Sequence, residues 1–420
     1  MSDKNLKTTT QEELPLTGYS WIIALLCSLT WIVSFISRNV WSTALPIAAP
    51  ELGLTMTAAG GLMTAFYIGY VAGNFFTGFV VDSIGPRKTL AAASILTGTF
   101  TLLIPFVSGY GPIFVLRILA GFSAGPLFAG GTKMQLAWFP VKARATAMQF
   151  VMSGPAIGMA IAAAGFAPII QNQGWKQGFI VAGIVTVVVG VITFLAAKER
   201  GIAKVRTKKA NTKTVEERKE ERKTLMSLIF RKQFVLGSFG QLLAVGAMNG
   251  FLTWIILYFT QVQGFTPIEA GSILGATSAV ALFSGTISGF ISDILKTRKK
   301  VVYIGCIAQF VSVMGLLLTK NITLLWVFMF LRVLIGAFAG NLNTIMAESN
   351  VGPYAGRTMG IYNMFCQLGS VIFPVFLGLI LDITGSFFVV LTTVASTYLV
   401  MGVLVFFMEE TAVKEVNKAA

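Results

Sequence analysis

Long apolar stretches, separated by short polar or turn-rich segments, follow one another along almost the whole chain. A helix that crosses the roughly 30 Å hydrocarbon layer of a bilayer needs about 20 mostly apolar residues. Twelve stretches have this character, at residues 21–45, 57–80, 89–108, 111–136, 146–170, 177–197, 233–259, 268–292, 301–319, 322–346, 358–381 and 386–408. Residues 1–17 are polar and no small-residue cleavage site follows the first stretch, so we expect that stretch to remain in the protein. The pattern predicts an all-α integral membrane protein with twelve transmembrane helices.

The composition agrees with a membrane protein and excludes several kinds of chemistry. Hydrophobic residues make up 55% of the chain and charged residues 12%, against about 25% charged residues in a typical soluble domain. The chain contains no histidine, which excludes Ser-His-Asp triads, histidine acid–base catalysis and histidine metal sites. Cys27, Cys306 and Cys366 lie far apart in apolar stretches, which argues against a disulfide framework or a zinc site. We therefore expect no enzyme activity, no metal and no cofactor.

The net charge of +15 would suggest a nucleic-acid partner in a soluble chain, but the placement of the charges gives another explanation. With the N-terminus in the cytoplasm, 26 Lys and Arg residues fall in cytoplasmic segments, and only Lys176 and Lys320 fall on the other side. Multi-pass membrane proteins concentrate Lys and Arg in cytoplasmic loops. We therefore expect no nucleic-acid partner, a surrounding lipid bilayer, a location in the cell (inner) membrane, and both termini in the cytoplasm.

A basic segment divides the predicted helices into two groups of six. Residues 198–232 contain thirteen Lys and Arg residues interleaved with five Glu residues. Oppositely charged pairs at three-residue spacing favour a helix there, whereas like-charged pairs at four-residue spacing oppose it. We expect a solvated, partly helical cytoplasmic linker near anionic headgroups. It separates an N-terminal six-helix half, residues 1–197, from a C-terminal six-helix half, residues 233–420, each with a short cytoplasmic tail.

The two halves repeat each other in sequence. At an offset of 211 residues, Ala59-Gly60 aligns with Ala270-Gly271, and residues 78–82 align with 289–293. At an offset of 215 residues, 117–121 aligns with 332–336, and Gly125 aligns with Gly340. Three ordered matches at nearly constant offset indicate a duplicated, pseudo-symmetric membrane unit, which is the organisation of many secondary transporters.

The loop after the second apolar stretch carries a motif. The pattern Gly-x-x-x-Asp-x-x-Gly-x-Arg/Lys-Arg/Lys is complete there, at Gly78, Asp82, Gly85, Arg87 and Lys88. It resembles the loop signature of the major facilitator superfamily, and the resemblance covers residues 20–408. The second copy keeps Gly289, Asp293 and Arg298-Lys299, but Lys296 stands where the second glycine would be.

The resemblance implies the twelve-helix major facilitator fold and a gate at these two loops. An aspartate at a helix end can engage neighbouring helix dipoles in one conformation only and so bias the equilibrium towards it. The superfamily uses this contact to latch the cytoplasmic face when the transporter opens outward. A basic loop that only sets topology is the alternative.

Further residues narrow the resemblance. Arg38-Asn39, the spacing Arg117-x-x-x-Gly121-x-x-x-Gly125, and Trp138-Phe139-Pro140 resemble the anion:cation symporter branch, which moves sugar acids, other carboxylates and organic phosphates. Two carboxylates tied to proton coupling in that branch are missing, because Ser37 precedes Arg38 and Ala124 precedes Gly125. The resemblance implies an organic anion as substrate, but it does not imply proton symport.

The charged residues within or near the predicted helices are cations. Each ionisable group at the bilayer centre costs about 2.5 kcal/mol or more, and the four here are Arg38, Arg117, Lys133 and Arg332. The 17 acidic residues lie in loops, tails or helix ends, so none stands mid-membrane to neutralise them. A cationic substrate would be repelled by such a cavity, whereas an anion would supply the missing charge. A guanidinium suits this role because it forms two parallel hydrogen bonds with a carboxylate or phosphate.

Structural roles remain open for all four cations. Arg38 and Lys133 lie near helix ends and can reach the headgroups, whereas Arg117 and Arg332 occupy matching repeat positions and can bind backbone carbonyls. Gly154-Pro155 partly resembles an antiporter motif but also permits close helix packing. Polar and aromatic candidates for the same cavity are Tyr67, Tyr70, Gln241, Asn249, Trp254, Tyr258, Asn341, Asn343, Asn363 and Gln367.

Together these features predict a secondary active transporter that moves a small organic anion by alternating access, through cation symport or anion exchange. No Gly-x-x-x-x-Gly-Lys-Ser/Thr motif is present, so ATP is not the expected driving force. Moving a monoanion inward against about 100 mV costs about 2.3 kcal/mol, so concentrative uptake needs a coupling ion or a counter-anion. An efflux antiporter for amphipathic compounds is the alternative, and a membrane receptor would leave the duplicated loop unexplained. We expect a monomer.

Overall fold

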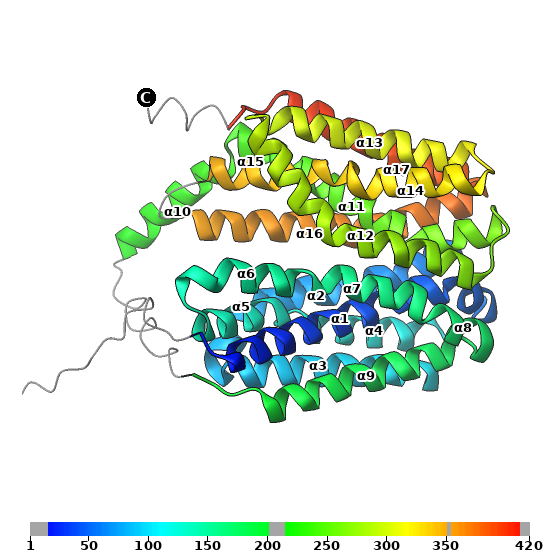
Figure 1. The fold of residues 1–420 in the computed structure, drawn as a ribbon, viewed down its shortest axis with the longest axis horizontal. Helices are drawn as coiled ribbons and strands as arrows, with labels where there is room; N and C mark the ends of the chain where they lie inside the picture. The colour runs from blue at the N-terminus through cyan, green and yellow to red at the C-terminus, as the bar shows by residue number, and fades with distance from the viewer. Residues whose placement is uncertain (1–15, 201–214, 351–353, 412–420) are drawn as a thin grey trace, which may run out of the picture.

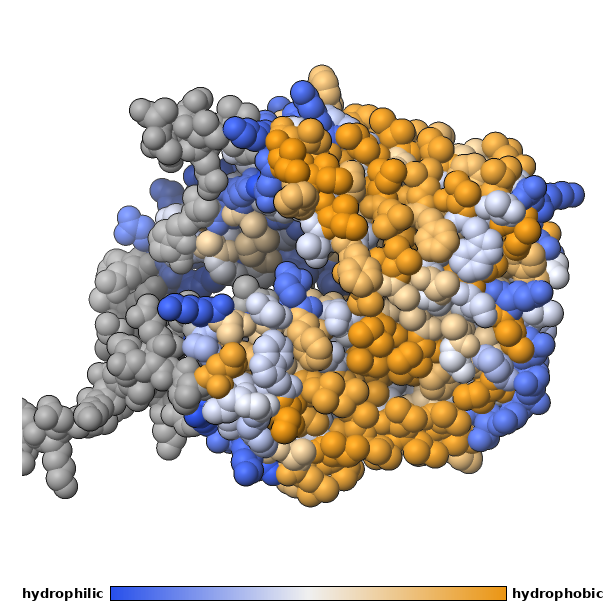
Figure 2. Space-filling view, viewed as in Figure 1, coloured by the Kyte–Doolittle hydropathy of each residue, from blue (hydrophilic) through white to orange (hydrophobic). Residues whose placement is uncertain are grey.

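The computed structural model describes residues 16–200, 215–350 and 354–411, and nearly all of them are helical. Within these residues, twelve helices are long and apolar enough to cross a membrane, and each overlaps one of the predicted stretches. The prediction of twelve spans is therefore confirmed. Apolar side chains cover the middle of the bundle, and hydrophilic residues gather at its two ends (Figure 2).

The first six spans come from the following elements: α1 (Gly18–Glu51), α2 (Met56–Ile84), α3 (Pro86–Leu103) with η1 (Ile104–Phe106), α4 (Tyr110–Ala124) with α5 (Leu127–Trp138), α6 (Val141–Met152) with α7 (Gly154–Ala160), η2 (Ile161–Gly165) and α8 (Ala167–Gln173), and α9 (Trp175–Ala196). Proline explains two of the breaks inside spans. Gly125-Pro126 separates α4 from α5, and Pro155 lies in the first turn of α7, because proline cannot donate the backbone hydrogen bond that a continuous helix needs.

The last six spans come from α11 (Lys232–Gln261), α12 (Pro267–Ile294), α13 (Lys299–Leu318), α14 (Ile322–Leu334) with η4 (Gly336–Asn341) and α15 (Leu342–Ser349), α16 (Ala355–Thr384) and α17 (Phe387–Phe406). Figure 1 shows α1–α9 gathered in one group and α11–α17 in a second group beside it. The described part of the basic segment forms the helix α10 (Val215–Ile229), and the rest of it, 201–214, lies outside the described residues. Glu221 of α10 pairs with Arg357 of α16 at 2.5 Å.

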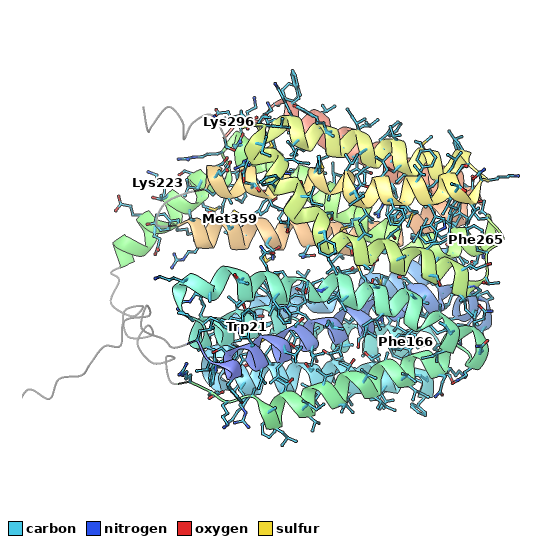
Figure 3. All side chains as sticks on the ribbon, viewed as in Figure 1. Trp21, Phe166, Lys223, Phe265, Lys296 and Met359 are labelled. Carbon is cyan, nitrogen blue, oxygen red and sulfur yellow. The ribbon has the colours of Figure 1, made fainter. Side chains whose placement is uncertain are left out.

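The two ends of the bundle differ in charge. The end at which α3, α6, α13 and α16 begin carries basic residues that include Arg87, Lys142, Arg298 and Arg357, and we call it the basic face. Lys296 lies at this face, whereas Phe265, just before α12, lies at the other end (Figure 3). We call that other end the opposite face.

The duplicated Ala-Gly pair explains how the two groups of helices touch. A Cβ on Gly60 of α2 would lie 2.3 Å from the Pro374 carbonyl oxygen of α16, and a Cβ on Gly271 of α12 would lie 2.4 Å from the Ala163 carbonyl oxygen of η2. Only glycine permits such a close approach between backbones. Both glycines lie near the start of their helix, so the groups are closed against each other on the side of the opposite face.

Candidate functional site

Arg38 of α1 is held inside a cage of aromatic rings. Its guanidinium carbon lies 4.4 Å from the ring centroid of Phe35, 4.6 Å from that of Tyr70, and 5.3 Å from those of Phe66 and Tyr67. Cation–π contacts orient a guanidinium without neutralising it. The side chain is 6% exposed, and its Nε and Nη2 donate to no described residue. A buried, oriented guanidinium with free donors is suited to bind an anionic group.

A chain of hydrogen bonds runs from this cage into the second group of helices. The Tyr67 phenol donates to Asn249 Oδ1 at 2.5 Å, and Asn249 Nδ2 donates to Ser370 Oγ at 3.0 Å. Ser370 in turn lies 3.2 Å from Gln367 Oε1. The chain thus joins α2 to α11 and α16, so two predicted site residues, Tyr67 and Asn249, meet across the boundary between the two groups.

A cavity of about 260 Å³ lies on the basic side of this hydrogen-bond chain. It is lined by Val71, Asn74, Phe75, Thr77, Phe128, Ala129, Gly360, Asn363, Met364 and Gln367. The predicted site residue Asn363 therefore faces a cavity. Gln367 also lines this cavity, and it is the last residue in the series of hydrogen bonds that starts at Tyr67. The surface is hollowed between the two groups at the basic face (Figure 2), so the described conformation is closed at the opposite face and open at the basic face.

Arg117 of α4 is completely buried, and backbone carbonyls occupy its donors. Its Nε donates to the Leu62 carbonyl at 3.0 Å, Nη1 to the Ser37 carbonyl at 3.0 Å, and Nη2 to the Arg38 carbonyl at 3.1 Å. These contacts tie α4 to α1 and α2 directly behind Arg38. The geometry favours the structural role for Arg117 over direct contact with an anion, because no guanidinium nitrogen is left without a partner.

Arg332, at the matching repeat position, makes different contacts. Its guanidinium carbon lies 3.7 Å from the ring centroid of Phe251, its Nε has no partner among the described residues, and the side chain is 6% exposed. Tyr258, another predicted site residue, lies apart from the Arg38 cage. Its phenol is 1% exposed and donates to the Leu316 carbonyl at 2.9 Å, inside the second group of helices.

A second cavity, of about 320 Å³, lies within the second group of helices. It is lined by Gln241, Ala244, Val245, Met248, Gln309, Gly336, Ala337, Ala339, Gly340, Asn343 and Tyr398. Gln241 and Asn343 were candidates from the sequence and do face a cavity. Asn341 does not line it, because its amide is buried and donates to Ser288 Oγ at 2.6 Å. Trp254 also has a packing role, since its indole donates to the Pro374 carbonyl at 3.1 Å.

Lys133 has an acidic partner on another helix. Its Nζ lies 2.5 Å from Oδ1 of Asp82, and both side chains are partly exposed. The partner was missed because Asp82 is 51 residues away in sequence and meets Lys133 only when α2 packs beside α5. Lys133 therefore lies with the loop motif around Asp82 rather than with the buried guanidiniums.

The two copies of the loop motif, 78–88 and 289–299, bind the last helix of their own group. Arg87 donates through Nε and Nη2 to the Phe194 carbonyl of α9, and Lys299 donates to the Met408 carbonyl just after α17. Cations at helix C-termini are stabilised by the helix dipole. Gly78, Gly289 and Lys88 have more open surroundings, since a Cβ on either glycine would meet nothing within 4 Å and Lys88 is exposed.

The second copy adds a network of carboxylates around Arg298. The guanidinium lies 2.5 Å from Asp293 Oδ1 and 3.0 Å from Glu348 Oε1. Its backbone N–H donates to Glu410 at 3.0 Å. Burial lowers the pKa of Arg298, but the hydrogen bonds and charges of Asp293 and Glu348 outweigh burial and hold that pKa above its ordinary value.

Both loop copies have a positive φ at the matching position. Gly85 has φ +84°, and Lys296, at the matching position, has φ +48° and is the only non-glycine residue with positive φ among those described. Left-handed backbone costs a non-glycine residue roughly 1–2 kcal/mol. The positive φ of Lys296 is therefore imposed by its surroundings in the second copy.

Asp382 joins the two groups of helices at the opposite face. Its carboxylate accepts the backbone N–H groups of Met56 at 2.8 Å and of Thr57 at 2.7 Å, and the Thr57 hydroxyl at 2.5 Å. The C-terminal end of α16 thus caps the N-terminus of α2, where the helix dipole favours a negative charge. From the sequence, Asp382 was only one of the acids nearest the membrane, because no motif surrounds it.

Several residues of the site carried no clear signal in the sequence. Phe35, Phe66 and Tyr398 lie in long apolar stretches, where aromatic residues are ordinary. Gln309 was a detectable exception, since it is a buried amide within the apolar stretch 301–319. Gly154 has the packing role weighed above, because a Cβ there would lie 3.0 Å from Trp31 of α1.

Comparison with known proteins places this geometry in context. Residues 27–374 and, in a second overlapping match, 298–420 match the model of the Major Facilitator Superfamily. The chain is 26% identical to the hexuronate transporter of Bacillus subtilis, over 87% of this chain and 89% of that protein. It is also 26% identical to a probable galactarate/D-glucarate transporter of the same organism, over 88% of each. A solved D-xylose-proton symporter shares the fold, with a TM-score of 0.75 and 14% identity over 94% of this chain and 99% of that one.

Proposed function

The chain belongs to the major facilitator superfamily, and we propose from this premise that it is a secondary active transporter of small organic anions, working by alternating access between its halves, 1–197 and 233–420. Its relatives support this substrate class, since they are named as transporters of hexuronate and of galactarate or D-glucarate. The proposed orientation places the basic face in the cytoplasm, because Lys and Arg mark the cytoplasmic side.

The observation that carries the proposal is the imbalance of buried charge. Arg38, Arg117 and Arg332 are buried, whereas no Asp or Glu is buried among the described residues. An unpaired buried charge costs several kcal/mol, so a bound anion relieves that cost while a cation would add to it. We assign the anchoring role to Arg38, whose free donors lie beside the Tyr67–Asn249 contact between the two groups of helices.

Alternating access has a physical basis in the same contacts. Closure at the opposite face depends on Asp382 capping α2 and on Gly60 lying against α16, whereas the cavity lined by Asn363 and Gln367 opens towards the basic face. The Tyr67–Asn249 hydrogen bond spans both groups, so a ligand beside it interacts with each group and has different contacts once they rock apart. Such differential contact is what allows a substrate to shift a conformational equilibrium.

We infer that the coupling is anion exchange rather than proton symport. Arginine stays protonated throughout the physiological range, and the chain has no histidine. With no buried carboxylate in the described residues, the Arg38 cage has no group that loads and releases a proton near neutral pH. An exchanged anion satisfies the same guanidinium on the return half of the cycle.

The test is counterflow in proteoliposomes that contain the purified full-length protein. Labelled D-glucuronate outside and unlabelled D-glucuronate, D-galactonate or D-glucarate inside should give accumulation without a proton gradient, and Arg38→Gln should abolish it while the protein still inserts. The lipophilic cation tetraphenylphosphonium serves as control. Transport of the cation but of none of the acids would contradict the proposal, and accumulation that depends on a proton gradient would contradict exchange.

A further inference from the structure

The duplicated arginines Arg117 and Arg332 do not share one role. Arg117 donates to three backbone carbonyls, whereas the guanidinium of Arg332 donates to no described residue and only packs on the face of Phe251. Both are at least nine-tenths buried. A structural role inherited from the repeat would have kept the carbonyl partners, so the buried charge of Arg332 needs another counter-charge.

Glycine packing explains why the two environments differ. In the first half, a Cβ on Gly121 would lie 1.9 Å from the Phe66 carbonyl oxygen and one on Gly125 would lie 2.5 Å from Gly73. This close approach of α4 to α2 brings the Leu62 carbonyl to Arg117. In the second half, a Cβ on the matching Gly340 would meet nothing within 4 Å, because Gly340 lines the second cavity.

Arg332 lies directly behind the wall of that cavity. Gln309 and Tyr398 both line it, and the Gln309 amide donates to the Arg332 carbonyl at 3.3 Å. Gly336, one helical turn after Arg332, also lines the cavity. The second cavity therefore lies in the field of an uncompensated positive charge.

The wall of the cavity also offers free hydrogen-bond acceptors. Oε1 of Gln309 and Oε1 of Gln241 are buried and have no partner among the described residues. The orientation of Gln309 is set by its bond to the Arg332 carbonyl, since only the amide nitrogen can donate there. Buried acceptors without partners are costly, and hydroxyl groups of a ligand are the donors that would satisfy them.

We propose that the second cavity binds a second anionic group of the substrate, with Arg332 as its counter-charge and the two glutamines accepting from adjacent hydroxyls. The preferred substrate is then a hydroxylated diacid rather than a monoacid. This inference rests on the proposed function, in which Arg38 binds the first carboxylate. Both sites lie along α11, because Asn249 accepts from Tyr67 of the Arg38 cage and its neighbour Met248 lines the second cavity.

Two six-carbon acids test this inference directly. D-glucarate and D-gluconate have the same chain length and differ in having a carboxylate or a hydroxymethyl group at one end. In the counterflow assay, wild-type protein should prefer glucarate by about tenfold, which corresponds to about 1.4 kcal/mol. Arg332→Gln should remove that preference by slowing glucarate, and Arg38→Gln should abolish transport of both acids.

Two further variants separate charge from folding. Gln309→Glu keeps the size of the side chain and places a carboxylate beside Arg332, so it should remove the glucarate preference even if Arg332→Gln fails to fold. Lys320→Gln removes one positive charge at the exposed opposite face and should leave the preference unchanged.

An equal rate for the two acids in wild-type protein would overturn the second anionic site. So would an unchanged glucarate preference in Arg332→Gln or Gln309→Glu. In either case, continued anion transport that depends on Arg38 would leave the proposed function standing. If neither acid is transported and tetraphenylphosphonium is, the proposed function falls together with this inference.

Discussion

The contact between Asp382 and the start of α2 allows a quantitative test of the closure at the opposite face. Asp382 is exposed, and its carboxylate accepts two backbone N–H groups and one hydroxyl from the other group of helices. Asp382→Asn keeps the size of the side chain and one carbonyl oxygen but removes the charge and one acceptor. We expect this variant to open the opposite face more often.

The size of the effect follows from the geometry. Removing a side-chain cap from a helix N-terminus typically costs about 1 kcal/mol, and at an exposed site the helix dipole contributes about 0.3–1 kcal/mol of the interaction with a negative charge. Asparagine retains part of the cap, so about 1 kcal/mol is the expected loss. That loss changes the ratio of the two conformations about fivefold.

The ratio of the two conformations can be measured by cysteine labelling at the basic face and at the opposite face. In a background without the three native cysteines, Thr64→Cys reports opening of the opposite face, because Thr64 is 7% exposed and donates to the Val371 carbonyl across the boundary between α2 and α16. Asn363→Cys reports opening of the basic face, since Asn363 lines the cavity there. With Asp382→Asn, maleimide should label the first site about fivefold faster and the second more slowly.

Glu269 provides the matched control. Its carboxylate lies at the same face and accepts the Thr266 N–H at 2.8 Å, but it caps its own helix, α12, and makes no hydrogen bond to the other group among the described residues. Glu269→Gln should therefore leave both labelling rates unchanged. Equal labelling rates at Thr64→Cys in Asp382→Asn and Glu269→Gln would refute the reasoning. Loss of a carboxylate that joins the two groups would then have no more effect on opening than loss of one that caps its own helix.

Three further changes separate the roles of other residues. Asp82→Asn should favour opening at the basic face, because the resemblance to the superfamily implies that Asp82 latches this face closed; unchanged labelling of Asn363→Cys would remove that role. Lys296→Gly should raise the thermal unfolding midpoint in detergent, since relieving a positive φ of +48° is worth about 1 kcal/mol; an equal or lower midpoint would show that the turn is unstrained. Arg117→Ala should lower the same midpoint strongly, because it removes three hydrogen bonds from a charged group, each worth about 1.5–3 kcal/mol, that tie α4 to α1 and α2, whereas Arg38→Ala should leave the midpoint near that of the wild type and abolish transport.

The fold could be predicted from the sequence because its signal is local. A membrane helix needs only its own apolar residues to be recognised, so all twelve spans were found, and the duplication was visible as short matches at nearly constant offset. The site was only partly predictable. An arginine in an apolar stretch is conspicuous, and Arg38 was found in that way, but whether a buried guanidinium is satisfied depends on carbonyls from other helices. Nothing in the segment 117–121 differs from 332–336 in a way that reveals the three carbonyls around Arg117.

Contacts between the two groups were the least visible, because each depends on one conformation and joins distant residues, 182 apart for Tyr67–Asn249 and 325 apart for Thr57–Asp382. Asp82 was recognised through its motif, although in the described conformation it pairs with Lys133 inside its own group. Asp382, without any motif, makes the contact that joins the groups. The two aspartates lie near the C-terminal ends of α2 and α16, which pack side by side. We expect Asp82 to cap the N-terminus of α16 when the basic face is closed, as Asp382 caps that of α2 in the described conformation. Caps of similar strength at the two faces would keep the two conformations close in energy, and the proposed transport needs this balance because a substrate can shift the equilibrium only by its differential affinity.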